Sequence, residues 1–317
     1  MSESERPIAI VGAGSIGIAF SLVFARAGVP VRLHDPDGDM RDLAPASVLG
    51  RARALAAFDL LDEAPERLAA RVTVFDDLAE ALTNACLVQE CAPERAELKR
   101  EIFIELDRFA PVDAVLASAS SAIPASVFAS ELPGRERCLI AHPGNPPYLL
   151  PVIEIAPAPF TADWAIQAAS ERFNAAGLKP VLVRKEVEGF VFNRLQGAML
   201  REAYCLVRDG VATVEDIDTV VRDGLGLRWS VIGPFETADL NTRGGIAAHA
   251  ERLGPAYARM GAERGQQDPW TEELVAEVER QRREKLPLAD WEARVAWRDR
   301  ELMKRIALRK FDKGADR

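Results

Sequence analysis

The sequence is poor in the residues that form metal sites and disulfide frameworks. It has three histidines and four cysteines in 317 residues, with no C-x-x-C pair and no histidine at metal-ligand spacing from a cysteine. The four thiols lie far apart or in apolar, strand-like runs, at Cys86, Cys91, Cys138 and Cys205. We therefore expect reduced, buried thiols in a cytoplasmic protein, and no metal centre.

Positive charge and long apolar runs are also scarce. Forty basic side chains stand against 49 acidic ones, and the formal net charge of −9 is the wrong sign for a protein that binds nucleic acid. The first apolar run, residues 7–11, is too short for a secretion signal or a membrane span. We expect a protein that is neither exported nor anchored to a membrane and has no nucleic-acid partner.

The chain has no internal repeat and no low-complexity linker, which excludes a solenoid and a disordered arm. Its length suits two domains. Over residues 1–187, short β-branched runs alternate with helical stretches, which predicts a Rossmann-type, doubly wound α/β domain with a mostly parallel sheet. From about residue 188 the strand signals stop, and amphipathic stretches predict an all-helical domain over residues 188–317. The predicted strands are IAIV, VPVRLH, RVTVF, ACLVQE, DAVLAS, RCLIAH, PVIEIAP and KPVLVR.

A glycine-rich motif follows the first predicted strand. Gly12, Gly14 and Gly17 have G-x-G-x-x-G spacing. The first allows a tight turn, the second lets the backbone approach a pyrophosphate, and the third lets helix and strand pack closely. The helix N-terminus that follows favours the anion. The motif predicts a dinucleotide site.

The second predicted strand ends in Asp35, 18 residues beyond Gly17. A carboxylate there can bond to the ribose hydroxyls and would repel a 2′-phosphate, which favours NAD. Arg32 and Arg41 are close enough in sequence to keep NADP as the alternative.

His142 ends an apolar run, and Glu154 lies in the next one. A glutamate buried among apolar residues needs a partner. Glu154 can bond to one imidazole nitrogen and fix the tautomer, so that the other nitrogen can accept a proton. The alternative is that His142 is a hydrogen-bonded core residue.

Two further polar groups are candidates for the same site. Ser120 and Ser121 follow a predicted strand, where active groups of doubly wound sheets gather, although Ser121 could instead cap the helix expected near Pro124. Asn193 lies near the start of a helix on an otherwise apolar face. Its amide suits either helix packing or donation to a substrate oxygen.

These motifs together resemble the 3-hydroxyacyl-CoA dehydrogenase superfamily. The resemblance is carried by VGAGSIG, SASSAIP, AHPGNPPYLLPVIEI and GFVFNRL. Two more segments, QECAPERAELKREIF and DGLGLRWSVIGPFETADLN, are similar to the branch that contains lambda-crystallin, which is L-gulonate 3-dehydrogenase. The similarity extends over nearly the whole chain and implies an NAD-dependent dehydrogenase that forms dimers through its helical domain.

The resemblance also implies roles for single residues. It makes His142 and Glu154 the catalytic pair, with Ser121 and Asn193 contacting substrate and Asn145 beside the histidine. It further implies that the cofactor touches Ser15, Ile16, Asp35, Glu94 and Lys99. Without it, Glu94 and Lys99 would be interpreted as a pair of solvated helix charges. Ala119 departs from the family pattern, because relatives carry Asn or Ser there.

The predicted reaction is oxidation of a secondary alcohol. Hydride leaves the carbinol carbon for the nicotinamide while His142 takes the hydroxyl proton, and Glu154 offsets the positive charge that develops. Residues 36–71 carry seven acidic side chains, five arginines and no lysine. A segment with this excess of negative charge is poorly suited to bind the phosphates of coenzyme A, which favours a small free hydroxy acid as the substrate. Arg228 is the candidate for binding its carboxylate, the alternative being an ion pair with Glu236 or Asp239.

Several alternatives remain open from the sequence. Carnitine 3-dehydrogenase would need an aromatic cage, to which Trp229 or Tyr148 could contribute, and a short-chain 3-hydroxyacyl-CoA dehydrogenase is a second rival. A structural NAD-binding protein without turnover, like a crystallin, is the rival from another class. The last amphipathic stretch suits either packing on its own domain or a dimer contact, with an apolar stripe of Trp291, Val295, Leu302 and Ile306.

Overall fold

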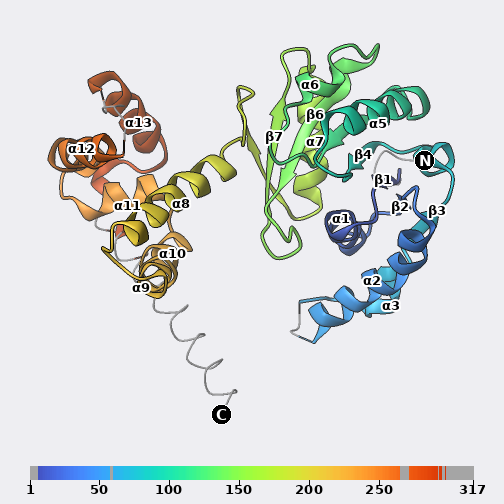
Figure 1. Cartoon of the computed structure of the whole chain (residues 1–317), viewed down its shortest axis with the longest axis horizontal. Coiled ribbons are helices and arrows are strands. Elements are labelled where there is room, and N and C mark those ends of the chain that lie inside the picture. The colour runs from blue at the N-terminus through green and yellow to red at the C-terminus, as the bar shows by residue number, and fades with distance from the viewer. Residues whose placement is uncertain (1–5, 58–59, 265–270, 292, 295–296, 298–317) are drawn as a thin grey trace. The chain divides into compact units, whose positions relative to one another are not determined.

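Short runs of β-branched and apolar residues form an eight-stranded sheet in the first part of the chain (Figure 1). The computed structural model describes residues 6–57, 60–264, 271–291, 293–294 and 297. The strands are β1 (Ile8–Val11), β2 (Val31–His34), β3 (Val72–Phe75), β4 (Leu87–Glu90), β5 (Val115–Ser118), β6 (Cys138–Pro143), β7 (Val152–Pro157) and β8 (Lys179–Leu182). All eight coincide with predicted strands.

The strand order is β3-β2-β1-β4-β5-β6-β7-β8. Neighbours are parallel except β6 and β7, which pair antiparallel. The order reverses at β1 and β4, which is where doubly wound sheets bind their ligands. The predicted Rossmann-type, mostly parallel sheet is therefore confirmed.

Helices cover both faces of the sheet because its strands are apolar on both sides. Ile8 and Ile10 pack in one core with side chains of α1 and α7, whereas Ala9 and Val11 pack in a second core with side chains of α5 and α6. The helices of this unit are α1 (Ser15–Arg26), α2 (Gly38–Ala56), α3 (Pro65–Ala69), α4 (Leu78–Leu82), α5 (Ala96–Phe109), α6 (Ala125–Ala129) and α7 (Asp163–Ala175).

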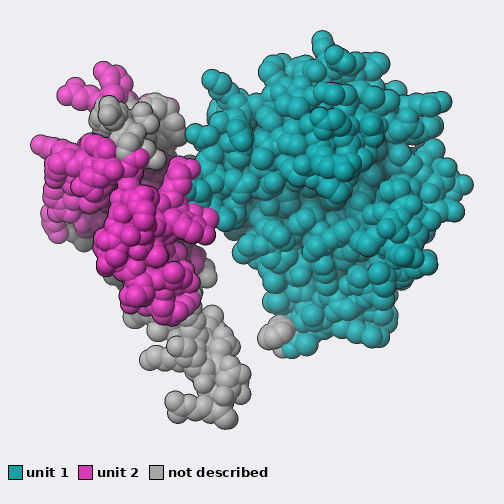
Figure 2. All heavy atoms as spheres, viewed as in Figure 1, with its two compact units in different colours: residues 1–197 teal, residues 198–317 magenta. Residues whose placement is uncertain are grey.

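The chain divides into two compact units, residues 1–197 and 198–317 (Figure 2). The division falls inside α8 (Phe192–Arg208), and the described part of the second unit is helical, as predicted. Its helices are α9 (Val214–Thr219), a π-helical segment (Val220–Leu225), α10 (Gly226–Trp229), α11 (Pro234–Asn241), α12 (Gly245–Glu263) and α13 (Glu272–Lys285). Within the described residues, no helix is both long and apolar enough to cross a membrane.

All four cysteines are free thiols, but Cys91 and Cys205 are only partly buried, so the prediction that all four are buried is wrong for these two. Cys91 lies just beyond β4, where the chain leaves the sheet. Of the predicted C-terminal apolar stripe, Val295, Leu302 and Ile306 lie outside the described residues.

Candidate active site

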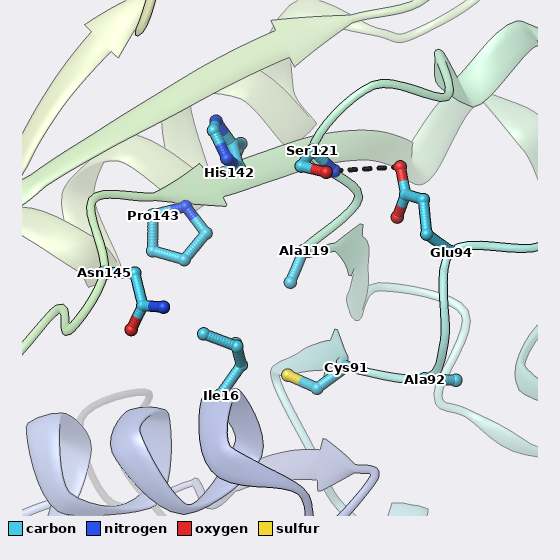
Figure 3. Close-up of a pocket in the computed structure, with 9 residues that line it drawn as sticks. All are labelled: Ile16, Cys91, Ala92, Glu94, Ala119, Ser121, His142, Pro143 and Asn145. Carbon is cyan, nitrogen blue, oxygen red and sulfur yellow. Dashed lines mark hydrogen bonds between the residues drawn. The ribbon is translucent and has the colours of Figure 1, made fainter. Parts of the chain in front are cut away.

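A pocket of about 310 Å³ opens at the carboxyl ends of the central strands (Figure 3). Its walls come from the start of α1, from the segments that follow β4 and β5, and from the end of β6 with the residues after it. This is the position at which active groups of a doubly wound sheet are expected. The lining residues are Ile16, Cys91, Ala92, Glu94, Ala119, Ser121, His142, Pro143 and Asn145.

The antiparallel pairing of β6 and β7 places His142 directly opposite Glu154. The imidazole Nδ1 of His142 lies 2.8 Å from Oε2 of Glu154. Both residues are buried, His142 being 8% exposed and Glu154 2% exposed. An ionised carboxylate only accepts, so Nδ1 carries the proton and donates it. Nε2 of His142 then has no hydrogen-bond partner among the described residues and is the nitrogen able to accept a proton.

The other oxygen of Glu154 is bonded too. Oε1 accepts the backbone N–H groups of Val191 and Phe192 at 2.8 and 2.9 Å. Burial alone would raise the pKa of Glu154, but the hydrogen bond from His142 and these two N–H groups lower it below its usual value. Glu154 is therefore a buried anion with donors on both oxygens.

Glu94 holds the serine turn after β5. Its Oε1 accepts the hydroxyl of Ser120 at 2.7 Å and three consecutive backbone N–H groups, at 3.0, 2.9 and 3.2 Å, from Ser121, Ala122 and Ile123. Burial raises the pKa of this carboxyl, but the Ser120 hydroxyl and the amides together lower it below its ordinary value. The turn is thus fixed around one carboxylate oxygen, and Figure 3 shows the bond from Ser121 to Glu94.

The two candidate serines have different environments in this turn. Ser120 is buried, and its hydroxyl is used inside the turn, whereas Ser121 lines the pocket. Pro124 is the N-cap residue of α6, and no side chain caps that helix, so the capping role considered for Ser121 is wrong. The amide of Asn193 donates to the backbone oxygen of Ser121 at 2.8 Å, which joins the start of α8 to the same turn.

Lys99 does not line the pocket. It is 1% exposed, and its Nζ lies 3.0 Å from both carboxylate oxygens of Glu90. Ser118 donates to Glu90 at 2.5 Å. Glu94 precedes α5 and is 3.9 Å from Nζ. The interpretation of Glu94 and Lys99 as solvated helix charges is therefore wrong, because the lysine is part of a buried ion pair.

The glycine loop fits a dinucleotide. Gly12 has φ +108°, which favours glycine, and a Cβ on Gly14 would meet no atom within 4 Å, so the space above it is open. Asp35 lies at the end of β2 and accepts the N–H groups of Ala13 and Asp37 at 2.6 and 2.9 Å. These contacts fix its carboxylate beside the loop.

Three arginines near this loop are bonded to the chain. The two arginines considered for NADP donate to backbone carbonyls, Arg32 to Glu80 and Ala81, and Arg41 to Asp35 and Pro36. Arg51 of α2 was missed by sequence reasoning. It reaches Ser15 at the start of α1, donating to its carbonyl at 2.8 Å and its hydroxyl at 3.2 Å. No sequence spacing signals that contact, since it depends on how α2 packs.

Cys91 and Ala92 were also missed as lining residues. The Cys91 sulfur points into the pocket in Figure 3. Burial, followed by the charge of Glu90, raises the pKa of this thiol well above its ordinary value.

Arg228 belongs to the second unit, in α10. Its Nε is buried and has no hydrogen-bond partner within the part of the chain that the structure describes. The two carboxylates considered as its partners bind other arginines, Glu236 binding Arg294 at 2.5 Å and Asp239 binding Arg283. The ion-pair alternative for Arg228 is therefore wrong.

Two family models match the chain. They are the NAD binding domain of 3-hydroxyacyl-CoA dehydrogenase over residues 7–187 and the C-terminal domain of 3-hydroxyacyl-CoA dehydrogenase over residues 189–291. Together they span both units.

Individual relatives agree with these models. The lambda-crystallin homolog of Bos taurus is 36% identical over 313 residues, covering 97% of each chain. L-carnitine dehydrogenase of Streptomyces griseus is 36% identical over 282 residues, which cover 88% of this chain and 80% of that protein. A solved structure of 5-formyl-3-hydroxy-2-methylpyridine 4-carboxylic acid 5-dehydrogenase, an NAD+ dependent dismutase, is 28% identical, with a TM-score of 0.72 over 90% of this chain and 97% of that one.

Proposed function

Because the chain belongs to the 3-hydroxyacyl-CoA dehydrogenase family of NAD-dependent dehydrogenases, we propose that it oxidises the 3-hydroxyl group of a small free hydroxy acid similar to L-gulonate. The hydrogen bond between Glu154 and His142, which lines the pocket, carries the proposal. An imidazole held by a buried carboxylate is suited to remove a proton from an alcohol.

The chain's own residues supply the acid–base chemistry. Glu154 keeps the proton on Nδ1, so Nε2 of His142 takes the hydroxyl proton, and the carboxylate offsets the charge that develops on the ring. General-base help of this kind contributes about 10²–10⁴-fold in rate. NAD, when bound, would supply the hydride acceptor for the carbinol carbon. We assign substrate contacts to Ser121, Asn145 and Asn193.

The loop of residues 12–17 and Asp35 would hold the cofactor, and we place Glu94 beside it. Lys99 is assigned to the cofactor site through its ion pair with Glu90, which precedes the pocket residues Cys91 and Ala92. Asp35 is the basis for preferring NAD to NADP.

The helical hairpin after β2 supports a free acid over an acyl-CoA. Coenzyme A phosphates need unpaired cations, but all five arginines of residues 36–71 already have partners in the chain. Three pair with glutamates, and two bind backbone or hydroxyl oxygens: Arg53, Arg67 and Arg71, then Arg41 and Arg51.

A free acid also needs a cation for its carboxylate, and we assign that role to Arg228. Its unpartnered Nε supports the assignment, because a buried guanidinium nitrogen without an acceptor is costly. A guanidinium binds a carboxylate through two parallel hydrogen bonds.

L-carnitine is the second candidate substrate, favoured by the Streptomyces griseus relative. The ring of Tyr148, considered for its cage, already has the guanidinium of Arg51 6.0 Å from its centroid. Carnitine carries a carboxylate as well, so the Arg228 assignment serves either acid.

The proposal is tested by incubating the protein with NAD and, separately, L-gulonate, L-carnitine and 3-hydroxybutyryl-CoA, following the absorbance of reduced cofactor. We expect L-gulonate to give the highest kcat/KM. Preference for the acyl-CoA contradicts the free-acid proposal, and absence of turnover with every compound favours a structural, crystallin-like role.

The variant His142→Ala tests the role of this histidine as the general base. We expect kcat to fall about 10²–10⁴-fold because the general base is lost, whereas the Kd for NADH stays near that of the unmodified protein. Turnover at the original rate would show that another group takes the proton.

A further inference from the structure

We infer that the turn formed by Gly189 and Phe190 is a positioning device for the catalytic pair. The inference rests on the proposed function of His142 and Glu154 and concerns a segment that contacts neither cofactor nor substrate in that proposal. Gly189 is the positioning residue, because its backbone conformation directs the N–H groups that follow it.

The turn has an unusual backbone. Gly189 and Phe190 are consecutive left-handed residues, with φ +75° and +48°. Among the described residues, Phe190 and Asn84 alone have positive φ without being glycine, and asparagine tolerates that region whereas a bulky side chain does not. Such a conformation persists only where its surroundings hold it.

The turn directs two successive backbone N–H groups toward Glu154. The N–H of Phe190 closes it by donating to the carbonyl of Val187 at 3.1 Å. The next two N–H groups, of Val191 and Phe192, then converge on Oε1 of Glu154. Oε2 is left for the imidazole of His142.

The rings of the same segment contact the histidine. Phe190 is 0% exposed, and its ring centroid lies 5.9 Å from that of His142, while Phe192 meets the imidazole edge-on at 6.3 Å. The segment therefore fixes both members of the pair, the carboxylate by hydrogen bonds and the imidazole by packing. If the N–H groups were turned away, Oε1 would be buried with no donor, and Glu154 would reorient.

Gly189→Ala tests the inference. The added Cβ would meet Asn193 at 3.5 Å, an ordinary contact, so the strain comes from the left-handed backbone alone. We expect kcat to fall about 10- to 100-fold because the pair is displaced, with the KM for NAD unchanged.

A second readout needs no turnover. Nitrogen NMR of protein labelled in its three histidines reports the tautomer of His142, whose signal is assigned by its loss in His142→Ala. We expect the Nδ1–H tautomer in the original protein and a mixture of tautomers in Gly189→Ala. This result decides the inference even if no hydroxy acid is oxidised, so its failure is distinguishable from failure of the proposed function.

Gly177→Ala is the control. Gly177 has φ +83°, is exposed, and a Cβ there would meet nothing within 4 Å, so the strain is comparable but remote from the pair. We expect both alanine variants to lower the melting temperature similarly and only Gly189→Ala to change the tautomer. Gly189→Asn should restore both tautomer and kcat, because asparagine tolerates a left-handed backbone. If Gly189→Ala keeps the tautomer and the kcat of Gly177→Ala, the inference is overturned.

Discussion

Gly14 and Gly17 lie in one loop, yet their missing side chains serve different purposes. A Cβ on Gly17 would lie 1.7 Å from the carbonyl oxygen of Gly12, so the packing of α1 against β1 requires glycine there. A Cβ on Gly14 would meet no protein atom within 4 Å. We therefore propose that glycine at position 14 serves a ligand and not the fold.

This contrast predicts opposite phenotypes. We expect Gly17→Ala to lower the free energy of unfolding by about 1–3 kcal/mol or more, because the added methyl group overpacks the contact between α1 and β1. Gly14→Ala should melt like the original protein but bind NADH at least about tenfold more weakly, a loss of about 1.4 kcal/mol. Thermal denaturation and a fluorescence titration with NADH measure the two effects. Unchanged NADH affinity in Gly14→Ala would place the pyrophosphate elsewhere.

Among the elements, all eight strands could be predicted from sequence because apolar, β-branched runs mark buried strands directly. The antiparallel direction of β7 was not predicted, although residues 144–151 between β6 and β7 are too few for the crossover that parallel strands require. That direction is what sets Glu154 opposite His142. The contacts of Lys99 and Arg51 were missed because each depends on how a helix packs, α5 against the end of β4 and α2 against the start of α1.

Helix α8 has an apolar face with no buried residue. Leu200, Tyr204 and Val207 are 45%, 75% and 40% exposed and recur at helical spacing. Exposed apolar surface of this kind marks an interaction site. It supports the proposal that the helical domain forms a homodimer.

Tyr204→Glu tests that proposal at the level of the helix. An unpaired charge buried in an interface costs about 3–5 kcal/mol, so we expect the variant to shift a dimer to monomer in sedimentation equilibrium. Val112→Glu is the matched control, since Val112 is an 89% exposed apolar residue of the first unit. A dimer that survives Tyr204→Glu would have its interface elsewhere.

For the whole molecule, stability at acid pH depends on the carboxylates whose folded pKa is lowered. The pKa values of the Glu94 and Glu154 carboxyls lie below their ordinary value of 4.5. When the pKa of a carboxyl is lower in the folded than in the unfolded protein, its charge contributes its full stabilisation at pH values above the unfolded pKa. That stabilisation is lost as the pH falls through the folded pKa. The protein should therefore lose stability as the pH falls below about 4.5.

Glu94→Gln isolates one of these contributions. We expect the variant to be less stable than the original protein at neutral pH and the difference to shrink as the pH falls, because the original carboxylate then becomes protonated and neutral. Urea denaturation at a series of pH values measures this. A difference that stays constant with pH would contradict a role for the Glu94 charge in holding the serine turn.

The thiol of Cys91 has a consequence for inhibitor chemistry. Alkylating agents and peroxide react with thiolates, and a group whose pKa lies well above its ordinary value keeps its proton at neutral pH. Electrophilic drugs designed to anchor on this sulfur will react slowly. Selective inhibitors of the pocket will have to rely on reversible contacts with its histidine, asparagine and backbone amides.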